Sequence, residues 1–178
     1  LILIPSRLSA SRLPNKPLLK INGKSIISLV VDRAKRSKLG EVIVATEDNK
    51  ILNEVKKNGG NAIITSNKHK TGTDRIYECL SKLKKRNIDY IINLQGDEPN
   101  IDGNDIINLN NFMINNNADI GTLATKIKSE TIRTILPINK YCRLDSFSWI
   151  KLLSINVRNV KKPAKSVIKN SIIIVKFF

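Results

Sequence analysis

Residues 5–18 read Pro5-Ser-Arg-Leu-Ser-Ala-Ser-Arg-Leu-Pro-Asn-Lys-Pro-Leu18 and follow the apolar run Leu1-Ile-Leu-Ile4. The apolar run predicts a short buried strand. Prolines fix φ and remove backbone donors, so we expect the segment after the strand to be a stiff, non-helical loop. The loop carries three cations, namely Arg7, Arg12 and Lys16. Because ligands of open α/β sheets bind at the carboxyl ends of the strands, the loop predicts a polyanion site. The alternative is a solvated basic surface.

A second polar loop follows another strand-like run. Residues 89–94 predict a strand, and Gln95-Gly-Asp-Glu-Pro99 breaks it. If both strands lie in one parallel sheet, Asp97 reaches the mouth of the site formed by the first loop. Mg²⁺ usually binds through one or two carboxylates plus substrate phosphates, so cations opposite a carboxylate indicate a nucleoside triphosphate site. The alternative for Asp97 and Glu98 is a turn before a helix N-terminus, where acids are favoured.

Predicted strands and helices alternate along the first two thirds of the chain. Apolar periodicity predicts helices over 25–38, 48–58, 74–86 and 102–116, and strands over 41–46, 61–65 and 118–126. Crossovers of this length are typical of right-handed βαβ units. We therefore predict an α/β fold with a Rossmann-like, mainly parallel sheet flanked by helices.

A polar block precedes the third predicted helix. Thr71-Gly-Thr-Asp-Arg75 would leave free N–H groups and hydroxyls at a helix N-terminus, which suits anionic or nucleoside contacts. The alternative is an ordinary N-cap by Thr73. The only histidine, His69, stands between two lysines, and we expect it to be exposed and without a catalytic role.

Six segments together carry a family resemblance. They are Pro5-Ser-Arg7, Ser11-Arg-Leu-Pro-Asn-Lys-Pro17, Ile21-Asn-Gly-Lys24, Val44-Ala-Thr46, Thr71-Gly-Thr-Asp-Arg75 and Asn93-Leu-Gln-Gly-Asp-Glu-Pro99. In this order, over about residues 1–130, the chain resembles the 3-deoxy-manno-octulosonate cytidylyltransferases, which make CMP-Kdo for lipopolysaccharide. The resemblance implies the nucleotide-diphospho-sugar transferase type of fold. It also implies transfer of CMP from CTP to Kdo with release of pyrophosphate. A cytidylyltransferase for sialic acid is the related alternative.

The same resemblance implies roles for the loop residues. Arg7, Arg12 and Lys16 would hold the triphosphate, and Lys16 would neutralise charge at the α-phosphate. Asp97 would hold Mg²⁺, so Lys16 and Asp97 are the expected catalytic residues. Gln95 would face nucleotide or sugar, and Thr73 and Arg75 would touch the nucleoside.

The pattern changes near residue 129. Acids nearly vanish beyond that point, and no glycine follows Gly121. We predict a nucleotide-binding domain over 1–128 and interpret 129–178 as an atypical basic tail, a truncated or frameshifted continuation. Family members carry sugar-binding residues, a second metal carboxylate and the homodimer contact there, and we recognise none of them. The hypothesis for this chain is weak CTP binding without turnover.

Charge is unevenly divided along the chain. The net charge is +16; residues 1–125 hold 19 Lys+Arg and 13 Asp+Glu, a net of +6, and residues 126–178 hold 12 and 2, a net of +10. A basic nucleic-acid-binding module is therefore an alternative of a different class. We expect no nucleic acid, because the aromatic residues needed to stack bases are few and scattered. The Lys, Asn and Ile richness also fits AT-rich codons.

The expected cellular compartment depends on the length of the apolar stretches. The apolar stretches are too short for a signal peptide or a membrane helix, so we expect a cytoplasmic protein without membrane insertion. Two cysteines form no disulfide framework and have no metal-ligand spacing. Cys79 lies on the apolar side of the third predicted helix, and we interpret it as a small core residue.

Overall fold

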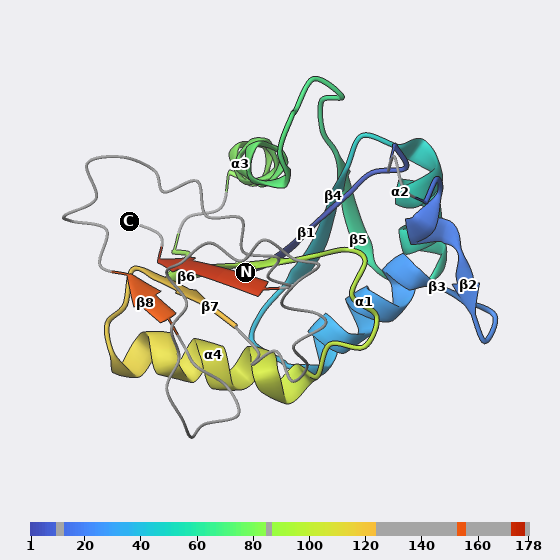
Figure 1. The fold of residues 1–178 in the computed structure, drawn as a ribbon. Coiled ribbons are helices and arrows are strands. Elements are labelled where there is room, and N and C mark those ends of the chain that lie inside the picture. Colours follow the sequence, from blue (N-terminus) through green and yellow to red (C-terminus); the bar gives the residue numbers. More distant parts are fainter. Residues whose placement is uncertain (10–12, 85–86, 124–152, 156–171, 177–178) are drawn as a thin grey trace, which may run out of the picture.

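A seven-stranded sheet forms the centre of the molecule, with strand order β5-β4-β1-β6-β9-β7-β8. The computed structural model describes residues 1–9, 13–84, 87–123, 153–155 and 172–176 (Figure 1). Four strands run parallel: β1 (Ile2–Ser6), β4 (Val42–Thr46), β5 (Asn61–Ile64) and β6 (Tyr90–Leu94). The predicted α/β fold with a mainly parallel sheet is confirmed.

Helices cover both faces of this sheet. They are α1 (Ile26–Arg36), α2 (Asn49–Lys57), α3 (Gly72–Leu83) and α4 (Gly103–Asn115). Helices α1, α2 and α4 share one apolar cluster, and α3 packs on the opposite face in a second, smaller cluster (Figure 1). Neighbouring residues of a strand point to opposite faces, so β1 sends Ile2 and Ile4 into the first cluster and Leu3 into the second.

The helical periodicities read from the sequence correspond to the buried faces. In α1 the predicted apolar stripe of Ile27, Val30, Val31 and Ala34 is buried. Cys79 is fully buried in the cluster under α3, and burial raises the pKa of its thiol to about 11. Its interpretation as a core residue is confirmed.

A small hairpin stands between the first loop and α1. Strands β2 (Lys20–Ile21) and β3 (Lys24–Ser25) pair antiparallel, and Asn22 and Gly23 between them both have positive φ. Positive φ at both turn positions is what a two-residue hairpin requires, and Asn-Gly supplies it at low cost. Just before it, Lys16–Leu18 forms one 3-10 turn (η1), so the prediction of a wholly non-helical loop is wrong there. Proline fits a first helical turn, where its missing N–H has no partner to lose.

Two strands described beyond residue 129 also belong to the sheet. Strand β9 (Ile172–Lys176) pairs antiparallel with β6 on one side and with β7 (Ile120–Thr122) on the other, and β8 (Leu153–Ile155) pairs with β7. The predicted strand over 118–126 is described only as far as residue 123. The division at residue 128 stays a prediction. Within the described ranges, no helix has the length and apolarity needed to cross a bilayer.

Candidate functional site

The carboxyl ends of the parallel strands meet at one edge of the sheet, where their loops line a cavity of about 310 Å³. The first loop, the loop between β5 and α3 and the turn after β6 all contribute to its wall. The lining residues are Pro5, Ser6, Arg7, Lys16, Pro17, His69, Lys70, Thr71, Gly72, Arg75, Gln95, Gly96 and Asp97. The loops predicted to face each other therefore do so, as expected for a ligand site of an open α/β sheet.

Lys16 and Asp97 contact each other across the mouth of the cavity. The Lys16 Nζ lies 2.8 Å from the Asp97 Oδ2, although 81 residues separate them in the chain. The side chains are 33% and 50% exposed, respectively. Exposed ion pairs typically contribute about 0–1 kcal/mol, so this contact can be exchanged for ligand contacts at small cost.

Gly96 sets how closely the turn after β6 approaches β1. A Cβ at this position would lie 3.0 Å from the Pro5 carbonyl oxygen and 3.3 Å from side-chain carbons of Ile4 and Ile27. A side chain would therefore push the turn away from β1, and Gln95 and Asp97 on either side of it would move with the turn. The close approach explains why a glycine separates these two polar residues.

The start of α3 differs from the sequence-based alternative. Thr71, not Thr73, is the N-cap: its Oγ1 accepts from the Asp74 N–H at 3.1 Å, and the Asp74 Oδ2 accepts from the Thr71 N–H at 3.2 Å. This reciprocal capping box places Thr71 and Gly72 on the cavity wall. Thr73 is exposed and is not among the described lining residues. The Thr-x-x-Asp spacing was the available signal for Thr71.

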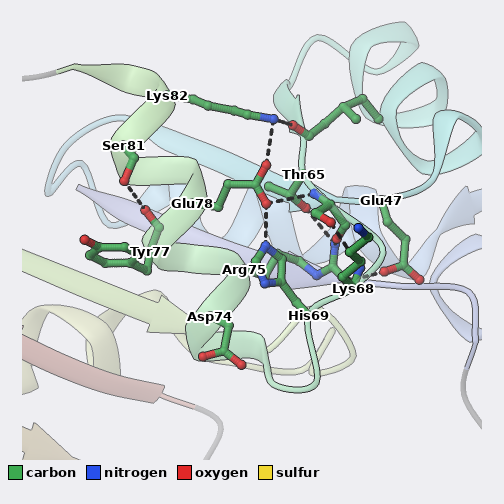
Figure 2. Close-up of polar contacts among 12 residues, drawn as sticks. Glu47, Thr65, Lys68, His69, Asp74, Arg75, Tyr77, Glu78, Ser81 and Lys82 are labelled. Carbon is green, nitrogen blue, oxygen red and sulfur yellow. Dashed lines mark hydrogen bonds and ion pairs between the residues drawn. The ribbon is translucent and has the colours of Figure 1, made fainter.

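Arg75 is buried at the cavity wall. Its side chain is 3% exposed, and its Nη1 donates to the Thr65 Oγ1 at 2.6 Å and to the Ser66 carbonyl oxygen at 3.4 Å. Its Nη2 forms an ion pair with Glu47, from the loop after β4 (Figure 2). These contacts tie the loop after β5 to α3, so Arg75 builds the wall that it lines.

The prediction that His69 is exposed is wrong. Its side chain is only 21% exposed and lies on the cavity wall. Its Nε2 contacts the Oε2 of Glu78 on α3, and Figure 2 shows Glu78 between His69 and Lys82. Glu78 also accepts from the Ser66 N–H at 2.8 Å and pairs with the Lys82 Nζ at 2.8 Å. The hydrogen bond from Lys82, then those from Ser66 and His69, lower the pKa of Glu78 to about 2.

Of the remaining predicted site residues, two line the cavity and one lies outside the described part of the chain. Arg7 and Gln95 line the cavity, and their roles in holding triphosphate and in facing nucleotide or sugar stay predictions. Arg12 lies outside the described residues. Lys70 adds a cation to the wall that the sequence analysis had not assigned. The Ser6 Oγ is buried without a hydrogen-bond partner in the described part of the chain, so a polar ligand could pair with it.

The donors at the cavity suit a metal that arrives with phosphates. No group of three or more His, Cys, Asp or Glu side chains placed to hold a metal occurs among the described residues. Among the lining residues that the structure describes, Asp97 is the one with a carboxylate, and its side chain is 50% exposed. One carboxylate is enough for Mg²⁺ when substrate phosphates supply further oxygen ligands.

A cation- and carboxylate-lined cavity at the carboxyl ends of parallel strands in an α/β sheet is typical of nucleotide-binding proteins. Residues 1–140 match the family model described as cytidylyltransferase, and the chain belongs to that family.

Its relatives agree with the resemblance noted from the six segments. The chain is 47% identical over 133 residues to the 3-deoxy-manno-octulosonate cytidylyltransferase of Thermodesulfovibrio yellowstonii, covering 71% of this chain and 52% of the relative. The enzyme of the same name from Brucella canis is 44% identical over 135 residues, covering 75% and 54%. The chain thus spans about half the length of the curated relatives it matches.

Solved structures give the same assignment. The structure of CMP:2-keto-3-deoxy-manno-octonic acid synthetase complexed with CTP superposes with a TM-score of 0.67 at 28% identity, covering 98% of this chain and 73% of that one. A cytidylyltransferase from Leptospira borgpetersenii superposes with a TM-score of 0.57 at 28% identity, covering 67% and 51%. The predicted family is confirmed.

Proposed function

We propose that this chain carries the CTP-binding part of an enzyme that transfers CMP from CTP to 3-deoxy-D-manno-octulosonate and releases pyrophosphate. The observation that carries the proposal is the meeting of Lys16 and Asp97 across one cavity, at the sheet edge where nucleotides bind. The names of the relatives favour Kdo over sialic acid as the sugar.

The triphosphate would lie against the cationic side of the cavity. Arg7 and Lys16 line it, and Arg12 belongs to the same loop. Hydrogen bonds to charged groups contribute roughly 1.5–3 kcal/mol each. Lys16, which sits at the mouth beside Asp97, is the residue we assign to charge neutralisation at the α-phosphate.

Asp97 would hold Mg²⁺ in the nucleotide complex. Bound there, Mg²⁺ would supply charge neutralisation on the phosphate oxygens. In that complex the ion pair between Asp97 and Lys16 would be broken. Asp97 would be a metal ligand, and Lys16 would contact a phosphate. The small cost of separating an exposed pair supports this exchange.

Gln95, Thr73 and Arg75 are the proposed contacts of nucleoside or sugar. Gln95 and Arg75 line the cavity, whereas Thr73 would need a ligand that extends beyond the described wall. Arg75 already donates to Thr65 and Ser66 and pairs with Glu47. A guanidinium has five N–H donors, so Arg75 can serve a ligand without leaving its place in the wall.

The reaction assigned to this site is a single displacement. A hydroxyl oxygen of the sugar forms a bond to the α-phosphorus, the bond from that phosphorus to the pyrophosphate oxygen breaks, and the hydroxyl proton leaves. Such transfers depend chiefly on positioning and charge neutralisation. The contribution of the residues described here is to hold the triphosphate and its charge.

Calorimetric titration of the chain with CTP in the presence of Mg²⁺ tests the proposal, with ATP as the control nucleotide. We expect CTP to bind more tightly than ATP and Asp97→Ala to remove the effect of Mg²⁺ on affinity. Equal affinity for the two nucleotides, or an unchanged Mg²⁺ effect in the variant, would contradict the proposal.

A further inference from the structure

The loop between β5 and α3 is fastened to α3 at two points. Arg75 holds its beginning through Thr65 and the Ser66 carbonyl oxygen. Glu78 accepts from the N–H of the same Ser66 and, further along the loop, contacts the His69 Nε2. The loop therefore presents His69 to the cavity in a fixed orientation, which the proposed function has not used.

The contact with Glu78 determines which imidazole nitrogen carries a proton. Glu78 is ionised over the ordinary pH range, since its three donors stabilise the charged form. An ionised carboxylate only accepts hydrogen bonds, so the His69 Nε2 must be the donor. The Nδ1 is then the nitrogen left for a second partner, which it can meet as a donor in the charged ring or as an acceptor in the neutral ring.

The charged groups around His69 come from five parts of the structure. Glu78, Lys82 and Arg75 belong to α3, Glu47 follows β4, Lys68 and Lys70 flank His69, and Arg7, Lys16 and Asp97 share its cavity. The three acids among these are already paired with cations, Glu47 with Arg75, Asp97 with Lys16 and Glu78 with Lys82. Added positive charge at His69 would therefore favour an anion in the cavity.

We propose that His69 is a further triphosphate contact of this cavity, in its protonated form, and that Glu78 is the positioning residue that orients it. The inference rests on the proposed function, because the anion it names is the triphosphate of CTP. Affinity for that anion then falls as pH rises, since the neutral imidazole presents a lone pair to phosphate oxygens.

Binding of inorganic tripolyphosphate, which has the triphosphate charges without base or sugar, tests the anion contact. Wild type and His69→Gln are compared by calorimetry without divalent metal, between about pH 5.5 and 8.5, a range that brackets histidine titration in general. We expect the variant to bind about tenfold more weakly at the acidic end and within about twofold at the alkaline end. Tripolyphosphate itself changes charge over this range. That change affects both proteins equally, so it cancels in the ratio of their dissociation constants.

Lys68→Gln is the matched control in the same loop. Lys68 is exposed, and lysine side chains in general do not change charge over this range, so we expect its removal to change affinity by the same factor at every pH. A wild-type to His69→Gln ratio that does not change with pH, or a wild type that binds no tripolyphosphate at the acidic end, would overturn the proposal.

Glu78→Gln tests the positioning role through a double-mutant cycle. We expect it to weaken tripolyphosphate binding at the acidic end in the wild type and to have no further effect in the His69→Gln background. Additive effects would assign Glu78 to structure alone. Because His69 is the only histidine, NMR of its ring nitrogens needs no assignment; a neutral form protonated at Nδ1 would also overturn the proposal.

The comparison of CTP with ATP separates this inference from the proposed function. Loss of CTP preference with the pH-dependent ratio intact would contradict the function and support the His69 contact. Retained CTP preference with a pH-independent ratio would contradict the His69 contact alone.

Discussion

Two ion pairs on the wall of one cavity have opposite environments. Lys16 and Asp97 meet at the mouth with side chains 33% and 50% exposed, whereas Arg75 and Glu47 meet inside with 3% and 17% exposed. An exposed pair is cheap to separate, while removing one partner of a buried pair leaves an uncompensated charge. The mouth pair is suited to exchange with ligands, and the inner pair is suited to holding the wall. Cation–carboxylate contacts of the same kind therefore have different consequences when broken.

The largest expected effect comes from breaking the mouth pair on its acidic side. In a full-length relative, we expect the change equivalent to Asp97→Ala to abolish Mg²⁺-dependent turnover, because the proposed metal ligand is lost. Glu98→Ala is the matched control, since Glu98 is the adjacent acid, is exposed and does not line the described cavity. Steady-state assays of pyrophosphate release measure both. Retained activity in the Asp97 variant would remove Asp97 from the site.

Breaking the inner pair should mainly affect folding. We expect Arg75→Ala to lower the free energy of unfolding by about 3–5 kcal/mol, because Glu47 would keep a largely buried, unpaired charge. Lys16→Ala should cost about 0–1 kcal/mol. Urea denaturation of the two variants compares them directly. Similar losses for both would show that exposure does not separate the two pairs.

The turn that carries Asp97 depends on the absence of a side chain at Gly96. Gly96→Ala brings a Cβ to within 3.0 Å of the Pro5 carbonyl oxygen, and overpacking of this kind costs about 1–3 kcal/mol. Gly103→Ala is the control, because its Cβ would make only ordinary contacts of 3.6 Å or more at the start of α4. Thermal unfolding measures both variants. An unaffected Gly96→Ala would mean that the turn can move away from β1 without cost.

The smallest expected effect is a change in how the free energy of unfolding depends on acidic pH when Glu78, which holds the His69 loop, is replaced. The pKa of Glu78 is lowered from 4.5 to about 2 in the folded chain, so its stabilising contribution is present above pH 4.5 and is lost as pH falls towards 2. Glu78→Gln should therefore flatten the decrease of the unfolding free energy in that range. Glu54→Gln, on α2 and bonded to Asn58, is the charge-matched control. Parallel curves for wild type and Glu78→Gln would contradict the assignment.

The local sequence pattern was sufficient to predict most helices and strands and the loops that line the cavity. The stripe of Ile27, Val30, Val31 and Ala34 gave the buried face of α1 because side chains three and four positions apart share a face. The breaks in apolar pattern after Ile4 and Leu94 located the two loops that meet at the cavity. Parallel strands put their carboxyl ends at one edge, so the meeting of the two loops at one cavity followed from strand direction, and the contact between Lys16 and Asp97 was seen only in the structure.

Errors arose where a side chain is held by a partner distant in sequence. His69 was expected to be exposed because its neighbours are lysines, but Glu78 draws it onto the wall. Arg75 was assigned only to ligand, whereas Glu47, 28 residues earlier, also holds it in the wall. The placement of β9 likewise joins residues far apart in the chain, Ile92 with Ile174 on one side and Gly121 with Ile174 on the other, a pairing that no local periodicity encodes.

The sequence by itself determined the four helices and the strands of the parallel part of the sheet, with the polar loops between them, because periodicity, proline and glycine act within a few residues. It also determined the family, since six short segments kept their order. Only the tertiary structure decided which charges are exchangeable and which are fixed. Burial and pairing depend on what other elements bring to a side chain, so Lys16 and Arg75 can be told apart in space but not in sequence.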